Sequence, residues 1–251
     1  MPATGSNTEA MQNGVIILEA RGVSCSKAPA SEPLARLQDV SLSIHAKTLN
    51  LLSGDEASGR GLLLRLLGLL DAPDEGEIYF HGAGTRGLAE EARAEIRNQR
   101  YGFLFSQPFL LPSFSVIENV AMPLFKISGA DAQEAQQRTE AMLAFAGMMD
   151  FAESPVEHLT FAQQQRVSLA RALVNQPEIL ILENMEACIG GEELALFIDD
   201  IQRAVVEFGV TAILTAGTGD AGKFSGRVIE LEGGAIRKDS QMALKEGGAE
   251  A

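Results

Sequence analysis

Residues 163–182 read QQQRVSLARALVNQPEILIL, and this stretch decides the fold. Its first part predicts a helix from about Phe161 to Asn175. Its end, the continuous apolar run in EILILE (178–183), predicts a central parallel strand, because such strands are buried on both faces. An amphipathic helix over 192–209 and a second buried strand over 210–217 follow. Strands that alternate with helices indicate a mostly parallel α/β sheet.

The amino-terminal half adds strands that lead into a glycine loop. VIILEARGVS (15–24) is predicted as an edge strand, and VSLSI (40–44) alternates as a half-buried strand does. TLNLLSG (48–54) is an apolar strand, and residues 62–70 read as a buried helix. The Gly-Gly pair in RVIELEGGAI (227–236) predicts a hairpin.

The domain limits follow from changes of character along the chain. Residues 1–14 are predicted as a disordered tail, 239–251 as a flexible tail, and 15–238 as one domain. From about 89 to 158 the pattern becomes mainly helical, which predicts an inserted helical subdomain.

Composition limits the classes of function. The chain has 251 residues, a net charge of −14 and a pI of about 4.7, which argues against a nucleic acid as partner. Its two cysteines, Cys25 and Cys188, are expected to be buried thiols in a reducing cytoplasm. The first residues do not resemble a signal peptide, and LLLRLLGLL (62–70) is too short to cross a bilayer. A cytoplasmic location is therefore expected.

The stretch SGDEASGRGLLL (53–64) has the spacing of a phosphate-binding loop. Such a loop has the form G-x-x-x-x-G-K-[ST], in which the lysine neutralises phosphates and the hydroxyl binds Mg²⁺. Here Arg60 and Gly61 follow Gly59, so the hydroxyl is missing, and Asp55 and Glu56 add negative charge. Taken alone, these glycines fit an ordinary turn before a core helix equally well.

Two longer stretches, 93–124 (RAEIRNQRYGFLFSQPFLLPSFSVIENVAMPL) and 159–182 (LTFAQQQRVSLARALVNQPEILIL), resemble the ATP-binding subunits of ABC transporters. The resemblance extends over about 15–238 and is strongest to the lipoprotein-release, macrolide-export and cell-division branch. It implies a P-loop NTPase (RecA-like) core, an antiparallel β-part and an inserted helical subdomain. It also implies a head-to-tail dimer in which ATP lies between the phosphate loop of one subunit and the signature segment of the other.

The resemblance also assigns positions for binding nucleotide, and many of them are altered. The phosphate-loop positions are Gly54, Ser58, Gly59, Arg60, Gly61 and Leu62. The family signature LSGGQ corresponds to residues 159–163, where Thr160 and Gln163 remain plausible contacts. Phe161 and Ala162 replace the two glycines that let backbone amides approach the γ-phosphate.

The positions that imply hydrolysis are altered too. The Asp-Glu pair of the family falls on Glu183, which could reach a metal weakly, and Asn184, which cannot act as a carboxylate base. Asn184 also suits a simple turn after a strand. The glutamine of the family falls on Ser106, with Gln107 one position late, and its switch histidine falls on Ala216. The dimer-loop aspartate falls on Gly190, and no aromatic stands where the family stacks adenine.

These substitutions lead to one main hypothesis and several alternatives. The chain is expected to be a nucleotide-binding-domain subunit with little or no catalysis, binding Mg²⁺-ATP weakly or not at all. It would act structurally or as a regulator on the inner face of a membrane, through a permease of the cell-division or macrolide-export type that docks on residues 108–125. The alternatives are a divergent ATPase using Arg60, Gln107 and Glu183, a partner of a competent subunit in a heterodimer, and a soluble interaction module. The transported substrate, and the choice between homodimer and heterodimer, stay open.

Overall fold

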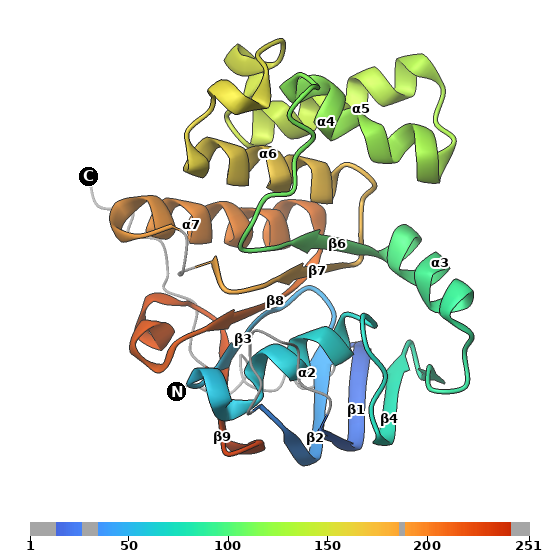
Figure 1. Cartoon of the computed structure of the whole chain (residues 1–251), viewed down its shortest axis with the longest axis vertical. Coiled ribbons are helices and arrows are strands. Elements are labelled where there is room, and N and C mark those ends of the chain that lie inside the picture. Colours follow the sequence, from blue (N-terminus) through green and yellow to red (C-terminus); the bar gives the residue numbers. More distant parts are fainter. Residues whose placement is uncertain (1–13, 27–34, 186–188, 242–251) are drawn as a thin grey trace, which may run out of the picture.

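The computed structural model describes residues 14–26, 35–185 and 189–241, which form two sheets and a helical layer (Figure 1). The larger sheet has the strand order β10–β9–β3–β8–β7–β6. Its strands are β3 (Leu49–Ser53), β6 (Tyr101–Leu104), β7 (Ile179–Leu182), β8 (Thr211–Ala216), β9 (Arg227–Glu232) and β10 (Ala235–Gln241). All neighbouring strands are parallel except β10, which forms the predicted Gly-Gly hairpin with β9. The apolar run at 179–182 lies inside this sheet, as its pattern predicts.

The smaller sheet is antiparallel and corrects one prediction. Its order is β2–β1–β4–β5, formed by β1 (Ile16–Cys25), β2 (Leu37–His45), β4 (Glu75–Phe80) and β5 (Ala83–Gly84). The prediction that β1 is an edge strand is wrong, because β1 pairs with β2 on one side and with β4 on the other. The strand that covers its second edge lies about 60 residues further along the chain, beyond the reach of a local pattern.

Helix α2 (Arg60–Leu67) lies between the two sheets and is apolar on nearly all sides. Five of its leucines are fully buried against residues of both sheets: Leu62, Leu63, Leu64, Leu66 and Leu67. A short helix that is hydrophobic all round needs burial on every side. This packing fixes the amino-terminal end of α2, and with it the glycine loop, against the carboxyl end of β3.

The helices α6 (Phe161–Leu173) and α7 (Gly191–Phe208) pack on the opposite face of the larger sheet. A separate apolar cluster joins α6 to α4 (Val116–Pro123) and α5 (Ala132–Phe145). In Figure 1 these three helices form the upper layer, and α7 crosses the middle of the molecule. Short helical segments occur at Glu56–Ser58, Leu124–Ser128, Met149–Phe151, Val156–His158 and Thr218–Lys223.

Two boundaries differ from the sequence pattern. The range 89–158 contains α3 (Glu90–Arg100) and also β6, which pairs with β7 in the larger sheet, so the helical layer itself begins after β6. Strand β10 continues to Gln241, past the predicted limit of 238, because Asp239 accepts two hydrogen bonds from Arg227.

Other predictions about the chain have mixed outcomes. Cys25 is buried and free, as expected, whereas Cys188 and nearly all of both predicted tails lie outside the described residues. In the part of the chain that the structure describes, no helix combines the length and the apolar character needed to cross a membrane.

Candidate functional site

The glycine loop leaves the carboxyl end of β3, in the middle of the larger sheet. It contains a turn of helix at Glu56–Ser58, then Gly59, and then the first turn of α2. The N–H of Gly54 donates to the carbonyl of Ala216 at 3.4 Å, which ties the loop to the end of β8. The first amides of a helix have no partner within it, so this loop has the architecture of a site for an anion.

Gly59 is required by both its backbone and its surroundings. Its φ is +88°, a conformation that side chains rarely adopt. A Cβ added there would lie 2.5 Å from the carbonyl oxygen of Arg36 and 2.8 Å from a methyl group of Leu37. The chain before β2 therefore packs directly on the loop. The turn between β9 and β10 holds it from another side, through a bond of 3.2 Å from the N–H of Gly234 to the carbonyl of Ser58.

The polar side chains of the loop serve its own conformation. The hydroxyl of Ser58 is buried, donates to the carbonyl of Asp55 at 2.7 Å, and accepts from the N–H of Arg60 at 3.3 Å. Asp55 and Glu56 are exposed and leave two negative charges beside the loop. The predicted contact Leu62 has its side chain fully inside the core, so it could offer only its backbone to a ligand.

Arg60 and Asn184, at the family's lysine and base positions, are joined directly. The Nη2 of Arg60 donates to the Oδ1 of Asn184 at 3.1 Å, across a sequence separation of 124 residues. Only 6% of Arg60 is exposed. Asn184 has a φ of +53°, which asparagine tolerates, and its N–H donates to the hydroxyl of Thr215 at 2.9 Å. The guanidinium therefore points towards the carboxyl ends of β7 and β8.

Few side chains that could bind a metal ion lie near the glycine loop and the carboxyl ends of β7 and β8. Glu183 is half-buried beside Asn184, and its N–H donates to the carbonyl of Leu104 at 2.9 Å. Gly61 is buried and carries no hydroxyl. Within the described residues, no group of three or more His, Cys, Asp or Glu is arranged to hold a metal ion. Ala216 is fully buried at the end of β8 and offers no group that transfers a proton.

The signature segment lies apart from the loop, at the amino-terminal end of α6. The hydroxyl of Thr160 accepts from the N–H of Gln163 at 3.3 Å, and the side chain of Gln163 accepts from the N–H of Thr160 at 2.9 Å. This reciprocal pair is a capping box. Phe161 is half-buried and packs against the cluster under α7. A hollow of about 240 Å³ lies between the start of α6 and the start of α7. It is bordered by Thr160, Ala162, Gln163, Arg166, Ile189, Glu193, Leu196 and Phe197.

The segment 105–109 is fixed by side chains of α6. Gln165 donates to the carbonyls of Phe105 and Ser106 at 3.2 and 2.9 Å. Arg171 donates to the carbonyls of Pro108 and Phe109 at 2.7 and 2.9 Å, and its burial lowers the pKa of its guanidinium. The predicted contact Gln107 is exposed.

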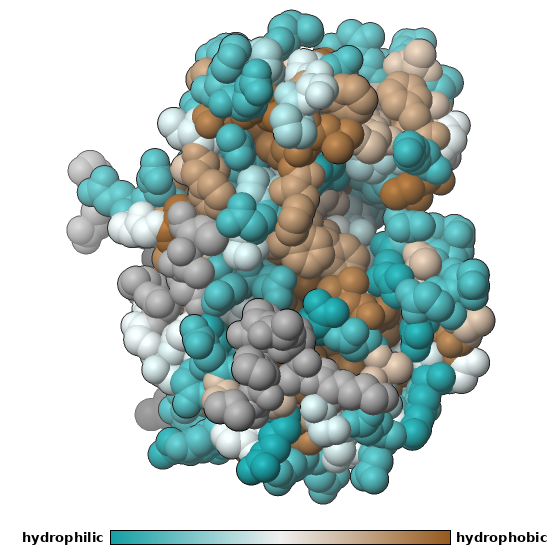
Figure 2. Space-filling model, in the orientation of Figure 1, coloured by the Kyte–Doolittle hydropathy of each residue, from teal (hydrophilic) through white to brown (hydrophobic). Residues whose placement is uncertain are grey.

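Exposed apolar side chains follow that segment. Phe109 is 68% exposed with a φ of +45°, an unusual conformation for a bulky residue. Leu111, Phe114, Phe125 and Ile127 are exposed as well. In Figure 2, hydrophobic side chains gather from the helical layer down to the middle of this face, where Figure 1 shows the chain running from β6 to α4. We call these five exposed apolar side chains, Phe109, Leu111, Phe114, Phe125 and Ile127, the apolar strip.

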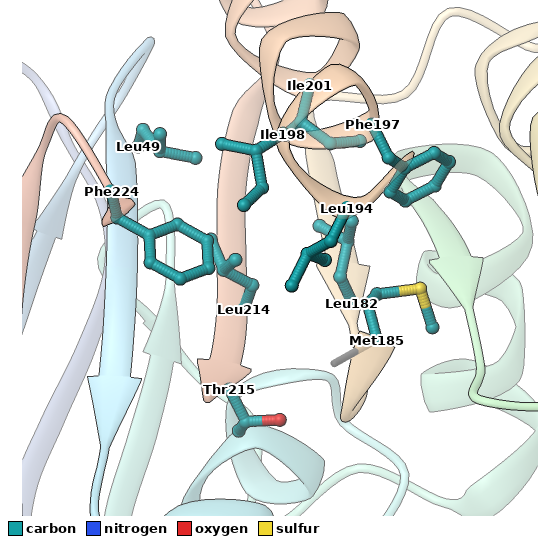
Figure 3. A pocket seen from close by; sticks show the side chains of 10 residues that line it. All are labelled: Leu49, Leu182, Met185, Leu194, Phe197, Ile198, Ile201, Leu214, Thr215 and Phe224. Carbon is teal, nitrogen blue, oxygen red and sulfur yellow. The ribbon is translucent and has the colours of Figure 1, made fainter. Parts of the chain in front are cut away.

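A second cavity lies inside the protein and has a different character. It measures about 10 Å³, room for about one water molecule, and lies between α7 and the larger sheet (Figure 3). Nine of its ten lining residues are apolar, and the tenth is Thr215. It is a packing gap of the core, and it offers no set of groups for chemistry.

The structure thus brings together the residues that the sequence places at the carboxyl ends of β3, β7 and β8. It adds contacts that the sequence did not indicate: the carbonyl of Arg36 on Gly59, the hydroxyl of Thr215 on Asn184, and the bond between Arg60 and Asn184. No local sequence pattern relates Arg60 to Asn184, since 124 positions separate them. His45, His81 and His158 do not join this group, and His81 instead contacts Glu178 at 2.6 Å.

Comparison with known proteins gives consistent matches. The family model described as ABC transporter matches residues 37–186. The chain is 31% identical over 214 residues to the lipoprotein-releasing system ATP-binding protein LolD of Koribacter versatilis, covering 85% of this chain and 96% of that protein. It is 33% identical over 209 residues to the macrolide export ATP-binding/permease protein MacB of Syntrophobacter fumaroxidans. That match covers 81% of this chain but only 29% of the longer MacB protein.

Solved structures give the same result. The dimeric, post-hydrolysis structure of the ATP-binding cassette MJ0796 bound to ADP and Pi has a TM-score of 0.77 and 28% identity. It covers 90% of this chain and 99% of that one. A structure of cbiO1 from Clostridium perfringens, part of the transporter complex cbiONQ, has a TM-score of 0.79 at 20% identity, which supports the fold alone.

Proposed function

Because this chain belongs to the ABC transporter family, as a nucleotide-binding subunit of the LolD and MacB type, we propose that it serves a transporter-like complex as a structural or regulatory subunit with little or no ATP hydrolysis of its own. The observation that carries this proposal is the bond between Arg60 and Asn184. It engages, inside the protein, the residues at the two positions where the family places its phosphate-binding lysine and its base.

The residues at the loop fit Mg²⁺-ATP poorly. A P-loop coordinates Mg²⁺ through a hydroxyl that Gly61 lacks, and Asn184 does not replace a carboxylate as base. The guanidinium of Arg60 is planar and bulkier than a lysine ammonium, and it already donates a hydrogen bond to Asn184. The carboxylates of Asp55 and Glu56 would repel a polyphosphate. The loop therefore lacks the groups that a hydrolytic step requires.

A heterodimer with a competent subunit is the second candidate. In a head-to-tail dimer, the partner's intact loop would face the signature segment of this chain. The capping box of Thr160 and Gln163 keeps that helix end well formed, which favours this candidate. Phe161 and Ala162 would still place side chains where the family uses glycine, so we expect impaired turnover at one composite site.

Nucleotide binding is the direct test of the main proposal. We expect the purified chain to bind ATP with a dissociation constant of about 1 mM or weaker, and Mg²⁺ to give no gain, since the metal lacks its hydroxyl ligand. Calorimetry with and without Mg²⁺, alongside Arg60→Ala, measures this. Micromolar binding that depends on Mg²⁺ and disappears in Arg60→Ala would contradict the proposal and favour a divergent ATPase.

The apolar strip supports docking on a membrane permease, which would place the chain at the inner face of a membrane. An amphipathic helix binds a groove through apolar contacts and needs no catalysis. We expect the double variant Phe109→Ser/Phe125→Ser to bind a permease of the macrolide-export type at least about tenfold more weakly than the wild type does, a loss of about 1.4 kcal/mol.

The matched control for this experiment is Val206→Ser. Val206 is 81% exposed on α7, outside the apolar strip, so its replacement removes a comparable exposed apolar side chain elsewhere. Affinity for the purified permease in detergent is the measurement. Equal binding by the wild type and the double variant would exclude the apolar strip as the docking surface, whereas no binding by the wild type would favour a soluble interaction module.

A further inference from the structure

Phe109 combines a strained backbone with an exposed aromatic ring. Its φ of +45° lies in the left-handed region, which a bulky residue enters at a cost in free energy. Its ring makes an edge contact with that of Phe105, with 5.8 Å between the centroids, yet Phe109 stays 68% exposed. Strain of this kind persists only where the surrounding structure holds it, and it is concentrated at functional sites. The contacts that hold this backbone therefore indicate what it is for.

Side chains of α6 hold the backbone at Phe109. The guanidinium of Arg171 donates to two consecutive carbonyls, that of Pro108 at 2.7 Å and that of Phe109 at 2.9 Å. These carbonyls belong to the peptide planes before and after Phe109, so fixing both planes fixes both backbone angles of this residue. Ser168 adds a bond of 3.4 Å to the carbonyl of Pro108. The planar, forked guanidinium suits two acceptors at once better than a lysine ammonium does.

A different side chain holds the next part of the apolar strip. Asn119 of α4 is fully buried, and its Oδ1 accepts from the N–H of Leu111 at 2.7 Å. Its Nδ2 donates to the carbonyls of Leu111 and Phe114 at 3.1 and 3.3 Å. Loss of Arg171 should therefore release the backbone at Phe109 and leave Leu111 and Phe114 in place.

We propose that Arg171 is a positioning residue for docking, because it holds Phe109 in the strained conformation that presents its ring as the anchor of the apolar strip. This inference rests on the proposed docking of a permease helix. A ring that is already in place loses less conformational freedom on binding, so it strengthens the complex. The segment 109–127 has one acidic and one basic residue, Glu118 and Lys126, so it offers no net charge to anionic lipid and suits the apolar face of a helix.

The first half of the experiment uses the free chain. Chymotrypsin cleaves after aromatic residues, and cleavage needs the backbone to open locally. We expect the bond between Phe109 and Leu110 to be cleaved at least about fivefold faster in Arg171→Ala than in the wild type, since two hydrogen bonds that oppose opening are lost. Mass spectrometry of the fragments measures the rate at this one bond. Equal rates in the two proteins overturn the proposal.

Arg203→Ala is the matched control. Arg203 on α7 also donates to a backbone carbonyl of the helical layer, that of Phe145 at 3.3 Å, and its guanidinium lies 4.5 Å from the centroid of that ring. Its removal costs a comparable arginine contact outside the apolar strip. Cleavage after Phe109 should therefore proceed in this variant at the wild-type rate.

The second half measures affinity for a purified permease of the macrolide-export type in detergent. Arg171→Ala should bind at least about fivefold more weakly than the wild type, and Arg203→Ala should bind equally well. Arg171→Lys keeps the charge and can hold one of the two carbonyls, so its affinity should lie between those of the wild type and Arg171→Ala. If Arg171 acts through Phe109, adding Arg171→Ala to Phe109→Ser should change the affinity by less than about twofold.

The outcomes separate this proposal from the proposed docking. Faster cleavage together with a loss of affinity that disappears in the Phe109→Ser background supports the positioning role. Wild-type affinity in Arg171→Ala, the same loss in both backgrounds, or an equal loss in Arg203→Ala overturns it and leaves the docking in place. Absence of binding by the wild type overturns the docking and the positioning role together.

Discussion

The purified chain, incubated with Mg²⁺ and ATP, is expected to release phosphate at least about 10⁴-fold more slowly than an intact cassette such as MJ0796. The reason is that the positions of the base, the metal-binding hydroxyl and the switch residue are altered together, at Asn184, Gly61 and Ala216. Groups that act as one unit give losses that are not additive, so removing several costs about as much as removing the most important one.

Restoring one group should therefore restore little. We expect Asn184→Glu to stay at the background rate, since the new carboxylate would face Arg60 and Gly61 would still provide no hydroxyl. The combined change Arg60→Lys/Gly61→Ser/Asn184→Glu tests whether the rest of the loop remains competent, and we expect it to gain Mg²⁺-dependent binding of ATP before it gains turnover. Phosphate release under saturating ATP is the measurement. The proposal would be wrong if the wild type hydrolysed ATP robustly and if Arg60→Ala or Asn184→Ala abolished that activity.

The second large effect is expected in the smaller sheet, where Gly76→Ala should lower the free energy of unfolding by about 3 kcal/mol or more. Gly76 has a φ of +75° in β4 and faces an irregular pairing between β1 and β4 after Arg21. A Cβ there would lie 2.5 Å from the carbonyl oxygen of Arg21 and even closer to that of Gly22. These are backbone atoms on a paired strand, so they cannot move without breaking the pairing.

Gly82→Ala is the matched control for that prediction. Gly82 has nearly the same φ, +76°, but nothing lies within 4 Å of an added Cβ. It should cost only the strain of the left-handed conformation, about 1 kcal/mol. Urea unfolding of both variants separates this strain from the clash. Equal losses in the two variants would contradict the prediction, because they would show that an added Cβ at Gly76 is accommodated without a clash.

Much of this protein was determined by local sequence. The apolar runs at 179–182 and before Gly54 predicted buried strands, and the mainly apolar helix after the loop was predicted to be buried. These features depend on which faces of a short segment are apolar, which the order of residues records directly. The altered loop, signature and strand-end positions could also be read in the sequence, since they are changes of residue type at fixed spacing.

The remaining features depended on contacts between distant segments. Strand β1 is internal only because β4 returns to its free edge, and the exposure of Gln107 depends on how α6 holds the segment before it. The bond between Arg60 and Asn184 joins residues 124 positions apart. Each side chain alone suits either solvent or a turn, and no local period relates them. Only the close packing of α2 between the sheets brings the guanidinium to the end of β7, and that geometry turns two separate substitutions into one interaction.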